Sequence, residues 1–275
     1  MDMIDIIKSV IIGIVEGITE WLPKSSTGHI ILTDRLLPLA ASNEFKEMFN
    51  LVIQLGAIMA VVVLFFDKLW PFTTKQNGYI KKDSISLWVK VIIAIIPAAV
   101  IGIPFDDWFT AKFHNEWVIA AMLILYGILF IVIECFNKNR TPKINTLGDI
   151  SYKTALIIGA FQMLSLIPGT SRSGATILGA MLIGVSRVAA AEFSFYLAVP
   201  VMFGASLIKI LDFGFNITGM EFVVLAVGMV TAFIVSIVAI KFLLGYVKKK
   251  DFKFFGYYRI ALGLLVLAYF SFFVK

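Results

Sequence analysis

The sequence predicts an all-α polytopic membrane protein with six transmembrane helices and two re-entrant helix-break-helix hairpins, arranged as two inverted-topology repeats. Of its 275 residues, 60% are hydrophobic and 15% are charged, whereas a soluble domain carries about 25% charged residues. Six uninterrupted apolar segments each approach the ~20 residues that a membrane-spanning helix requires. Two further apolar segments contain proline, glycine and charged side chains, which lipid tolerates only where they face protein or line a cavity.

The first half of the chain, residues 1–146, is expected to form one hairpin and three spans. Residues 4–37 are apolar enough to enter the membrane, but Pro23, the following SSTG run and His29 interrupt them. A segment broken in this way is expected to enter and leave the membrane on one side. The spans that follow are predicted at residues 47–66, 87–104 and 116–136.

The second half, residues 147–275, is expected to repeat this order within the same membrane domain. Its hairpin is predicted at residues 153–186, with breaks at Pro168-Gly169 and at Ser173-Gly174. Its spans are predicted at residues 189–211, 219–243 and 254–273. A displacement of 146 residues aligns Gly13 with Gly159, Glu16 with Gln162, Ser25 with Ser171 and Gly28 with Gly174. Because each half has an odd number of spans, the second copy is predicted to be inverted in the membrane.

Loop charge predicts the orientation. Three loops are basic and carry Lys68, Lys75, Lys81 and Lys82, then Lys138, Arg140, Lys143 and Lys153, then Lys248, Lys249, Lys250 and Lys253. By the positive-inside rule these loops are cytoplasmic, both termini lie outside and the first hairpin opens to the outer face. Four basic residues fall on the outer side in this arrangement and count against it: Lys8, Lys24, Arg35 and Lys46.

Composition also excludes several classes of protein. Cys135 is the single cysteine, which excludes an internal disulfide and a cysteine-based metal cluster. The net charge of +6 lies in a few loops rather than in a basic stripe with interleaved aromatic residues, so no nucleic-acid partner is expected. The N-terminus lacks the basic region and the cleavage site of a removable signal peptide, so we expect it to be mature sequence.

Two acidic residues in the first hairpin indicate a cation site. Glu16 and Glu20 are four residues apart and lie on one face of a helix. Two carboxylates in a low-dielectric site repel each other, so one of them takes a proton or a cation lies between them. A divalent ion such as Mg²⁺ or Ca²⁺ prefers oxygen ligands and shares its shell with substrate phosphates. The alternative is a pair of glutamates at a solvated helix end.

The same hairpin holds a hydroxyl and an imidazole. Ser26 and His29 are three residues apart, which allows the imidazole to reach the hydroxyl if the segment is helical. Serine becomes a good nucleophile only beside a base. The alternative is that Ser25, Ser26 and Thr27 cap the second half of the hairpin, a role that we assign more readily to Ser25.

The second hairpin is suited to an anion. Its PGTSRSGAT segment, Pro168–Thr176, places Arg172 among glycines and hydroxyls at the expected start of a half-helix. Free backbone N–H groups and the positive end of the helix dipole favour anions there, and the guanidinium fork matches phosphate oxygens. The alternative is a structural ion pair between Arg172 and Glu16 or Glu20.

Together these groups favour phosphoryl chemistry on a phosphorylated lipid, in which catalysis depends on positioning and charge stabilisation. We expect the substrate to be bound by Ser25, Thr27, Gly28, Gly169, Thr170, Ser171, Ser173, Gly174, Thr176 and Gln54. The rival reading is a secondary transporter or lipid-carrier flippase, because inverted repeats with broken helices are the plan of such transporters. Gln54 could equally serve only to link helices.

Three motifs carry a resemblance to a known family: EGITEWLPKSSTGH (Glu16–His29), FNLVIQLGAIMAVV (Phe49–Val62) and PGTSRSGAT. The chain resembles the undecaprenyl-diphosphate phosphatases, bacterial plasma-membrane enzymes linked to bacitracin resistance. The resemblance covers the chain from end to end. It implies a metal-dependent, inverted-repeat enzyme that hydrolyses the lipid diphosphate to the monophosphate and phosphate, and so recycles the cell-wall lipid carrier.

The resemblance implies catalytic roles for Glu16 and Glu20 as the paired-acid motif, and for Ser26, His29 and Arg172. Our working hypothesis is that the two glutamates hold Mg²⁺ or Ca²⁺ and that Arg172 takes up negative charge. Ser26, deprotonated by His29, then attacks the terminal phosphorus. Attack by a metal-bound water, with Ser26 only binding phosphate, is an alternative that the sequence leaves open. The sequence also leaves open whether the protein forms a homodimer.

Overall fold

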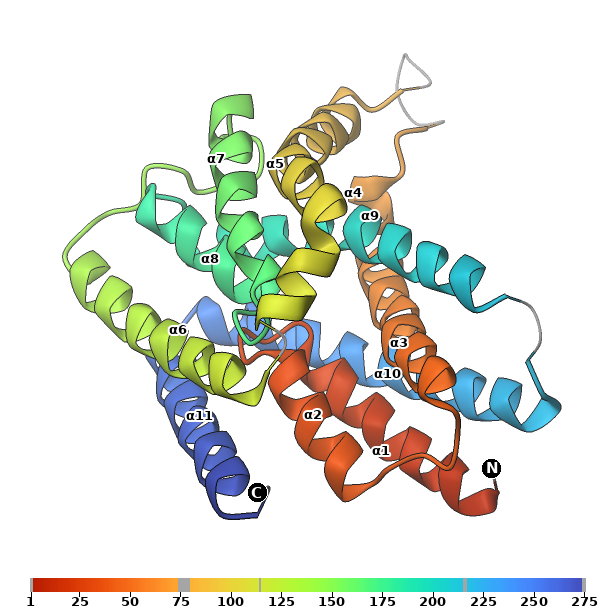
Figure 1. The fold of residues 1–275 in the computed structure, drawn as a ribbon. Coiled ribbons are helices and arrows are strands. Elements are labelled where there is room, and N and C mark those ends of the chain that lie inside the picture. The colour runs from red at the N-terminus through yellow and green to blue at the C-terminus, as the bar shows by residue number, and fades with distance from the viewer. Residues whose placement is uncertain (1, 74–79, 114, 215–216, 274–275) are drawn as a thin grey trace.

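The computed structural model describes residues 2–73, 80–113, 115–214 and 217–273, and these are organised into helices (Figure 1). Within these ranges the only β-type pairing consists of two isolated bridges, Phe72 with Ile80 and Ile144 with Val185. Lys75, counted above among the loop lysines, lies outside the described residues. The prediction of an all-helical protein is therefore confirmed for the described part of the chain.

Six helices in the described ranges are long and apolar enough to cross a membrane. They are α3 (Asn43–Leu64), α5 (Lys82–Phe113), α6 (Glu116–Asn137), α9 (Arg187–Phe213), α10 (Gly219–Val247) and α11 (Lys253–Phe273). Each contains nearly all of one predicted span, so the six spans are confirmed. The largest difference is at α5, which continues beyond the predicted end at residue 104. Pro104 removes one backbone donor without ending the helix, and the aromatic rings of Trp108 and Phe113, which pack edge to face, lie in the added turns.

The two broken segments each form a pair of short helices. The first consists of α1 (Met3–Thr19) and α2 (Ser26–Leu36), with the break around Pro23. The second consists of α7 (Tyr152–Gln162), the 3₁₀ turn η1 (Met163–Leu166) and α8 (Arg172–Leu182), with the break around Pro168-Gly169. A further short helix, α4 (Phe66–Leu69), follows α3.

The second break predicted in this segment, at Ser173-Gly174, is wrong. α8 runs through both residues, and everything from Ser173 to Met181 is buried. The hydroxyl of Thr176 donates to the carbonyl of Arg172, so a polar side chain supports the first turn from within the protein. Small and hydroxylated residues therefore permit close packing of this helix here, rather than breaking it.

Ser25 and Ser171 begin α2 and α8 with the same unusual backbone. Their φ angles are 73° and 70°, and no other non-glycine residue in the described ranges has a positive φ. Each side-chain oxygen accepts a hydrogen bond from the N–H of a glycine three residues on, Gly28 at 3.4 Å and Gly174 at 3.2 Å. The predicted capping role of Ser25 is confirmed. A strained cap costs about 1–3 kcal/mol, so the surrounding structure must hold both turns in place.

The helices pack in matching pairs. α1 packs on α10 and α7 packs on α5, while α6 packs against α11 and α3 against α9. Two glycines that the 146-residue displacement aligns allow the first two contacts. A Cβ on Gly13 would lie 2.7 Å from the carbonyl oxygen of Gly228 on α10, and a Cβ on Gly159 would lie 2.1 Å from that of Ala94 on α5. Only glycine permits so close an approach of the backbones.

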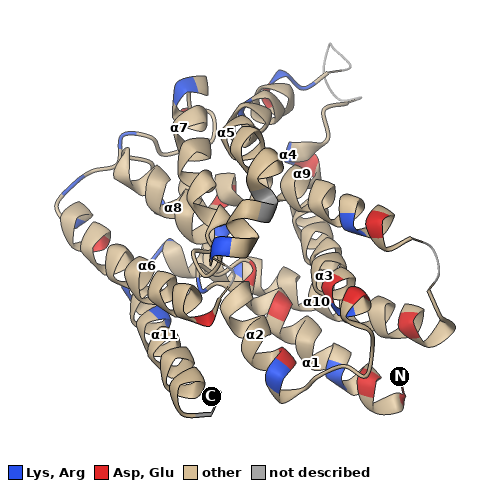
Figure 2. Cartoon of the chain, in the orientation of Figure 1, with Lys and Arg blue, Asp and Glu red and all other residues tan. Residues whose placement is uncertain are grey.

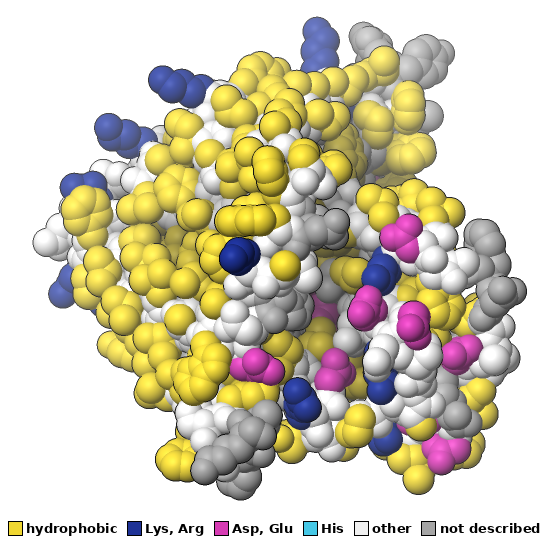
Figure 3. All heavy atoms as spheres, viewed as in Figure 1, with side chains coloured by type: hydrophobic (Ala, Val, Ile, Leu, Met, Phe, Trp, Pro, Cys, Tyr) yellow, Lys and Arg dark blue, Asp and Glu magenta, His cyan; other side chains and the backbone are white. Residues whose placement is uncertain are grey.

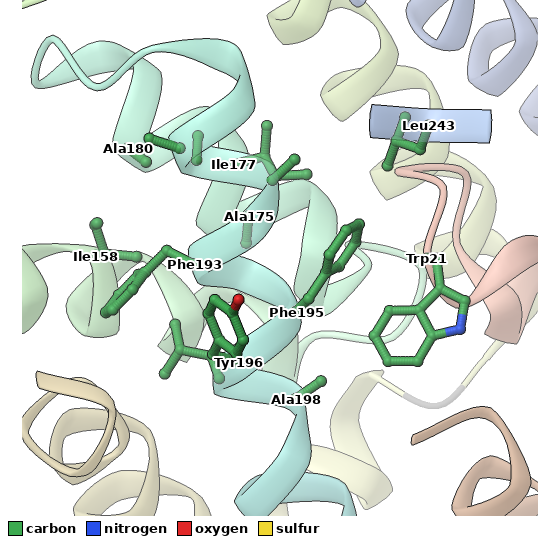
Figure 4. Packing of buried hydrophobic residues seen from close by; sticks show 14 of the residues in the cluster. Trp21, Ile158, Ala175, Ile177, Ala180, Phe193, Phe195, Tyr196, Ala198 and Leu243 are labelled. Atoms are coloured by element: carbon green, nitrogen blue, oxygen red, sulfur yellow. The ribbon is translucent and has the colours of Figure 1, made fainter. Parts of the chain in front are cut away.

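The largest buried apolar cluster surrounds the breaks (Figure 4). Trp21, in the first break, packs edge-on against Phe195 of α9 with ring centroids 5.3 Å apart. Ala175 and Ile177 of α8 belong to the same cluster, so the core holds both broken segments against α9.

The outer surface divides by chemistry. Hydrophobic side chains cover much of the face over α5, α6 and α7 (Figure 3), as lipid-facing helices require. Lys and Arg mark the start of α5, the start of α7 and the loop after α6, whereas Asp and Glu gather with basic residues around α1, α2 and α3 (Figure 2). One end of the molecule is therefore basic and the other is mixed.

Candidate active site

The two breaks meet at an ion pair. Nη2 of Arg172, the first residue of α8, lies 3.2 Å from Oε1 of Glu20, which ends α1. The hydroxyl of Ser173 donates to the backbone oxygen of Glu20 at 3.3 Å. Both charged side chains are about nine-tenths buried, with 10% of Arg172 and 9% of Glu20 exposed. Of the alternatives that the sequence left open, the pair forms with Glu20.

Glu20 also binds the hydroxyl that the sequence singled out. Oγ of Ser26, the first residue of α2, donates to Oε2 of Glu20 at 2.9 Å. One carboxylate thus bridges a hydroxyl from its own hairpin and a guanidinium from the other. This arrangement gives Ser26 an adjacent base and fixes its Oγ beside a cation.

Arg172 is held from α9 as well. Its Nη1 donates to the carbonyl of Ser194 at 2.8 Å, and the Ser194 hydroxyl is hydrogen-bonded to that of Thr176 at 2.8 Å. The Nε of Arg172 is buried without a partner in the described part of the protein. The guanidinium is therefore fixed in place with a donor still free for an anion.

Glu16 is fully buried, and neither carboxylate oxygen has a hydrogen-bond partner in the described part of the protein. It lies one helical turn before Glu20, whose N–H donates to the Glu16 carbonyl at 3.0 Å. A buried carboxylate without a partner is costly and requires a proton or a cation.

The two acids fit an oxygen-seeking divalent ion that completes its shell elsewhere. Within the described ranges no group of three His, Cys, Asp or Glu side chains could hold a metal. The protein would therefore supply the carboxylates of Glu16 and Glu20, while water and phosphate oxygens supply the remaining ligands, which is the usual situation of Mg²⁺.

His29 faces away from Ser26. Its Nδ1 lies 2.7 Å from the carbonyl oxygen of Ser25, and its Nε2 lies 2.6 Å from the hydroxyl of Tyr258 on α11. A carbonyl only accepts, so Nδ1 carries the proton and the neutral ring accepts from Tyr258 at Nε2. The hydrogen bond from Ser26 goes to Glu20, and this structure does not form the Ser26–His29 contact that the spacing allowed.

The other predicted binding residues surround the breaks. Ser25, Thr27 and Gly28 form the start of α2, whereas Gly169, Thr170, Ser171, Ser173, Gly174 and Thr176 form the second break and the start of α8. The Ser171 cap occupies the N–H of Gly174, so this amide is already bonded. Gln54 is half-buried on α3, and the structure gives it no hydrogen bond to the described residues of the cluster.

Arg259 on α11 is a site residue that the sequence reasoning missed. It is fully buried, and its Nη2 donates to the carbonyls of Gly169 at 2.8 Å and Thr170 at 2.9 Å. Its Nη1 reaches the carbonyl of Pro23 at 3.4 Å. One side chain therefore holds both breaks. A charged residue inside the predicted span 254–273 was the signal that could have found it.

Tyr258, the residue before Arg259, is half-buried and bonded to His29. The ammonium group of Lys24 lies 4.3 Å from the centroid of its ring. Lys24 is half-buried and makes no ion pair with an acid in the described part of the chain. Tyr258 of α11 thus contacts both His29 and Lys24 of the first broken segment.

The fold and the cluster define the class: a polytopic helical membrane protein whose two broken segments bring a hydroxyl, two carboxylates and a guanidinium together in its interior. Such a set is suited to displacement at phosphorus, because it combines a nucleophile, a base and stabilisation of negative charge.

Comparison with known proteins identifies the family. Residues 9–265 match the family model described as bacitracin resistance protein BacA, and the chain belongs to this multi-pass membrane family. A relative from Enterococcus faecalis named undecaprenyl-diphosphatase is 62% identical over 269 residues, which is 97% of this chain and 98% of the relative. A protein of the same name from Acetivibrio thermocellus is 60% identical over 268 residues, 98% of each chain. The resemblance drawn from the three motifs is confirmed.

Proposed function

We propose that this chain hydrolyses undecaprenyl diphosphate to undecaprenyl phosphate and inorganic phosphate, recycles the cell-wall lipid carrier and confers bacitracin resistance. The observation that carries the proposal is the contact of Ser26 and Arg172 with the two oxygens of Glu20. The names of relatives that match nearly the whole chain support the same activity.

The proposed first step transfers a phosphoryl group to Ser26. Oγ forms a bond to the terminal phosphorus, its proton passes to Glu20, and the P–O bond of the anhydride breaks so that undecaprenyl phosphate leaves. Arg172 stabilises the charge on the phosphate oxygens. Water then cleaves the phosphoserine and releases inorganic phosphate. In a variant of this mechanism, water attacks directly and Ser26 only binds the phosphate.

His29 has a conditional role in this scheme. Its Nε2 accepts from Tyr258, so it could deprotonate Ser26 only after its ring turns away from Ser25 and Tyr258. Glu20 needs no such movement, because its oxygen is already 2.9 Å from the hydroxyl. We therefore propose Glu20 as the first proton acceptor and His29 as a second acid–base group of the site.

Glu16 and Glu20 would hold the divalent cation, Mg²⁺ or Ca²⁺. Both oxygens of buried Glu16 are without partners in the described structure, which supports this assignment. When bound, the ion would neutralise phosphate charge at the site. We keep as proposed substrate contacts the hydroxyls and glycines of both breaks.

The proposed membrane arrangement has two re-entrant hairpins, within repeats 1–146 and 147–275 of opposite orientation in the bacterial plasma membrane. Support comes from the matched turns at Ser25 and Ser171 and from the matched packing of α1 on α10 and of α7 on α5. The basic end seen in Figure 2 would be cytoplasmic, so both termini and the opening of the site would face outward.

Phosphate release by the purified protein in detergent tests the proposal. Wild type should release phosphate from undecaprenyl diphosphate when Mg²⁺ or Ca²⁺ is present, and Ser26→Ala should fall to background. Ser165→Ala is the matched control, because this hydroxyl, on η1, donates to the Gln162 carbonyl at the end of α7, outside the cluster. Transport requires a sealed compartment and hydrolysis does not. Absence of release by folded wild-type protein would therefore favour the transporter or flippase reading.

A further inference from the structure

A cavity lies where the ends of α6, α8 and α10 meet the start of α9, away from the cluster of Glu20, Ser26 and Arg172. Its volume is about 520 Å³. The cationic side chains that line it are Lys138, Arg140, Lys143, Arg187 and Lys248. In Figure 2 this region belongs to the basic end, along the loop that leaves α6.

Most of this positive charge is uncompensated. The Nε of Arg187 donates to both oxygens of buried Glu134, at 2.8 and 3.2 Å, and the same carboxylate accepts from the N–H of Phe252 at 2.9 Å. Glu134 is thus fully engaged. The remaining four cations, Lys138, Arg140, Lys143 and Lys248, form no ion pair with an acid in the described ranges. Such a cluster favours an anion.

The loop after α6, which carries Lys138, Arg140 and Lys143, is fixed to the protein. The N–H groups of Lys143 and Ile144 donate to the carbonyl of Gly184, at 2.9 and 3.1 Å, and Ser186 donates back to Ile144 at 2.8 Å. The guanidinium of Arg140 lies 3.6 Å from the centroid of the Phe136 ring. The charged groups are therefore held around the cavity rather than spread along a free segment.

The remaining wall of the cavity is apolar. Met181, Leu182, Ile183 and Val247 line it, and Leu182 is 43% exposed. Beyond the rim, Val132 and Phe136 on the outer side of α6 are each more than half exposed. A ligand that fits both surfaces carries a phosphate next to hydrocarbon.

The mixed end of the molecule provides a contrast. The pocket at the end of α2 and the starts of α3 and α6 has two acids, Asp34 and Glu116, beside two bases, Arg35 and Lys46. Its charges balance, and Arg35 lies 4.0 Å from Glu116. Uncompensated positive charge is therefore a property of this cavity, not of every pocket at a helix end in this fold.

We propose that this cavity binds the headgroup of an anionic phospholipid of the phosphatidylglycerol or cardiolipin class. The phosphate would lie among Arg140, Lys143 and Lys248, and the acyl chains would follow Leu182 and the outer face of α6. Basic pockets between helices at the cytoplasmic side of a membrane recognise such headgroups by charge and position. The site is distinct from the cluster of Glu20, Ser26 and Arg172.

Native mass spectrometry of the purified full chain tests this site, with phosphatidylglycerol or phosphatidylcholine titrated into the detergent. The triple variant Arg140→Gln, Lys143→Gln, Lys248→Gln is compared with Lys153→Gln, Lys249→Gln, Lys250→Gln. The control removes the same charge from exposed residues that do not line the cavity.

Wild type and the control should bind phosphatidylglycerol in preference to phosphatidylcholine, and the cavity variant should bind it about a hundredfold more weakly, given the usual contribution of each interfacial cation. Equal weakening in both variants would overturn the proposal, because it would indicate diffuse attraction. If the cavity variant retained phosphatidylglycerol, the proposal would also be overturned. The same holds if inorganic phosphate, added as a competitor, displaced the bound lipid as effectively as phosphatidylglycerol does. If the triple variant is unstable, Lys248→Gln alone provides the same comparison with Lys249→Gln.

Discussion

At the break between α1 and α2 the chain turns through Ser25, and at the break between α7 and α8 it turns through Ser171 with nearly the same φ. The residues that follow these turns differ in chemistry. Ser26 occupies the position of Arg172, and Glu16 occupies that of Gln162. The first break therefore supplies acids and the hydroxyl proposed as nucleophile, whereas the second supplies the guanidinium. A matched backbone thus presents unlike halves of one site, and neither break is sufficient alone.

Removing the carboxylate that joins the two halves should have the largest effect. Glu20→Gln takes away the base beside Ser26 and the negative charge that pairs with Arg172, so kcat should fall by about 10³ or more. Phosphate release at saturating substrate measures this. The matched control is Glu47→Gln, which breaks the exposed pair with Lys209 and should be nearly silent. A loss of less than tenfold in Glu20→Gln would show that the bridge is not part of the chemistry.

Changing the shape of the cation without removing its charge should have the next largest effect. Arg172→Lys cannot bind Glu20 and the Ser194 carbonyl together, because it lacks the planar fork. We expect kcat/KM to fall about a hundredfold, as for loss of one donor to a developing charge. Arg35→Lys, at the exposed pair with Glu116, is the control. Wild-type kinetics in Arg172→Lys would mean that charge alone is sufficient at the second break.

Making the first break resemble the second at one position tests the cation site. Glu16→Gln introduces the residue found at Gln162, which is also buried and unpartnered in the described structure. The Mg²⁺ or Ca²⁺ concentration required for half-maximal activity should rise about tenfold or more. Thermal stability without the cation should not fall, since glutamine is neutral and spares the cost of protonating or pairing a buried carboxylate. An unchanged cation requirement would remove Glu16 from the site.

The smallest effect concerns the shared turns. Replacement of Ser25 or Ser171 by Ala keeps the backbone strain and loses the cap, whereas Gly loses the cap and relieves the strain. At both positions the Ala variant should be less stable than the Gly variant by about 1 kcal/mol, measured by thermal unfolding in detergent. If the Ala variant were the less stable of the two at one position and the more stable at the other, the two turns would not be equivalent.

Local sequence patterns were sufficient to predict the spans, the helix starts and the residues of the cluster. Runs of apolar residues define the six long helices, and Ser25 caps α2 as its residue type predicts. The 146-residue displacement aligned Ser25 with Ser171 before their backbone angles were known. Each of these features depends on residues close together in the chain.

The orientation of side chains across the site could not be predicted in this way. The hydrogen bonds of His29 and of both breaks to α11 join residues as far as 236 positions apart, and no local pattern records them. The break expected at Ser173-Gly174 was predicted from residue type alone, whereas burial between helices makes these residues good packing residues.

The most direct test of the account is a rapid-quench experiment with undecaprenyl diphosphate labelled on its terminal phosphate. Label is expected on Ser26 during the first turnover of wild type. In Glu20→Gln, the appearance of labelled Ser26 should be slowed to the same extent as phosphate release. Turnover without labelled protein, together with substantial activity in Ser26→Ala, would contradict it and assign the attack to water.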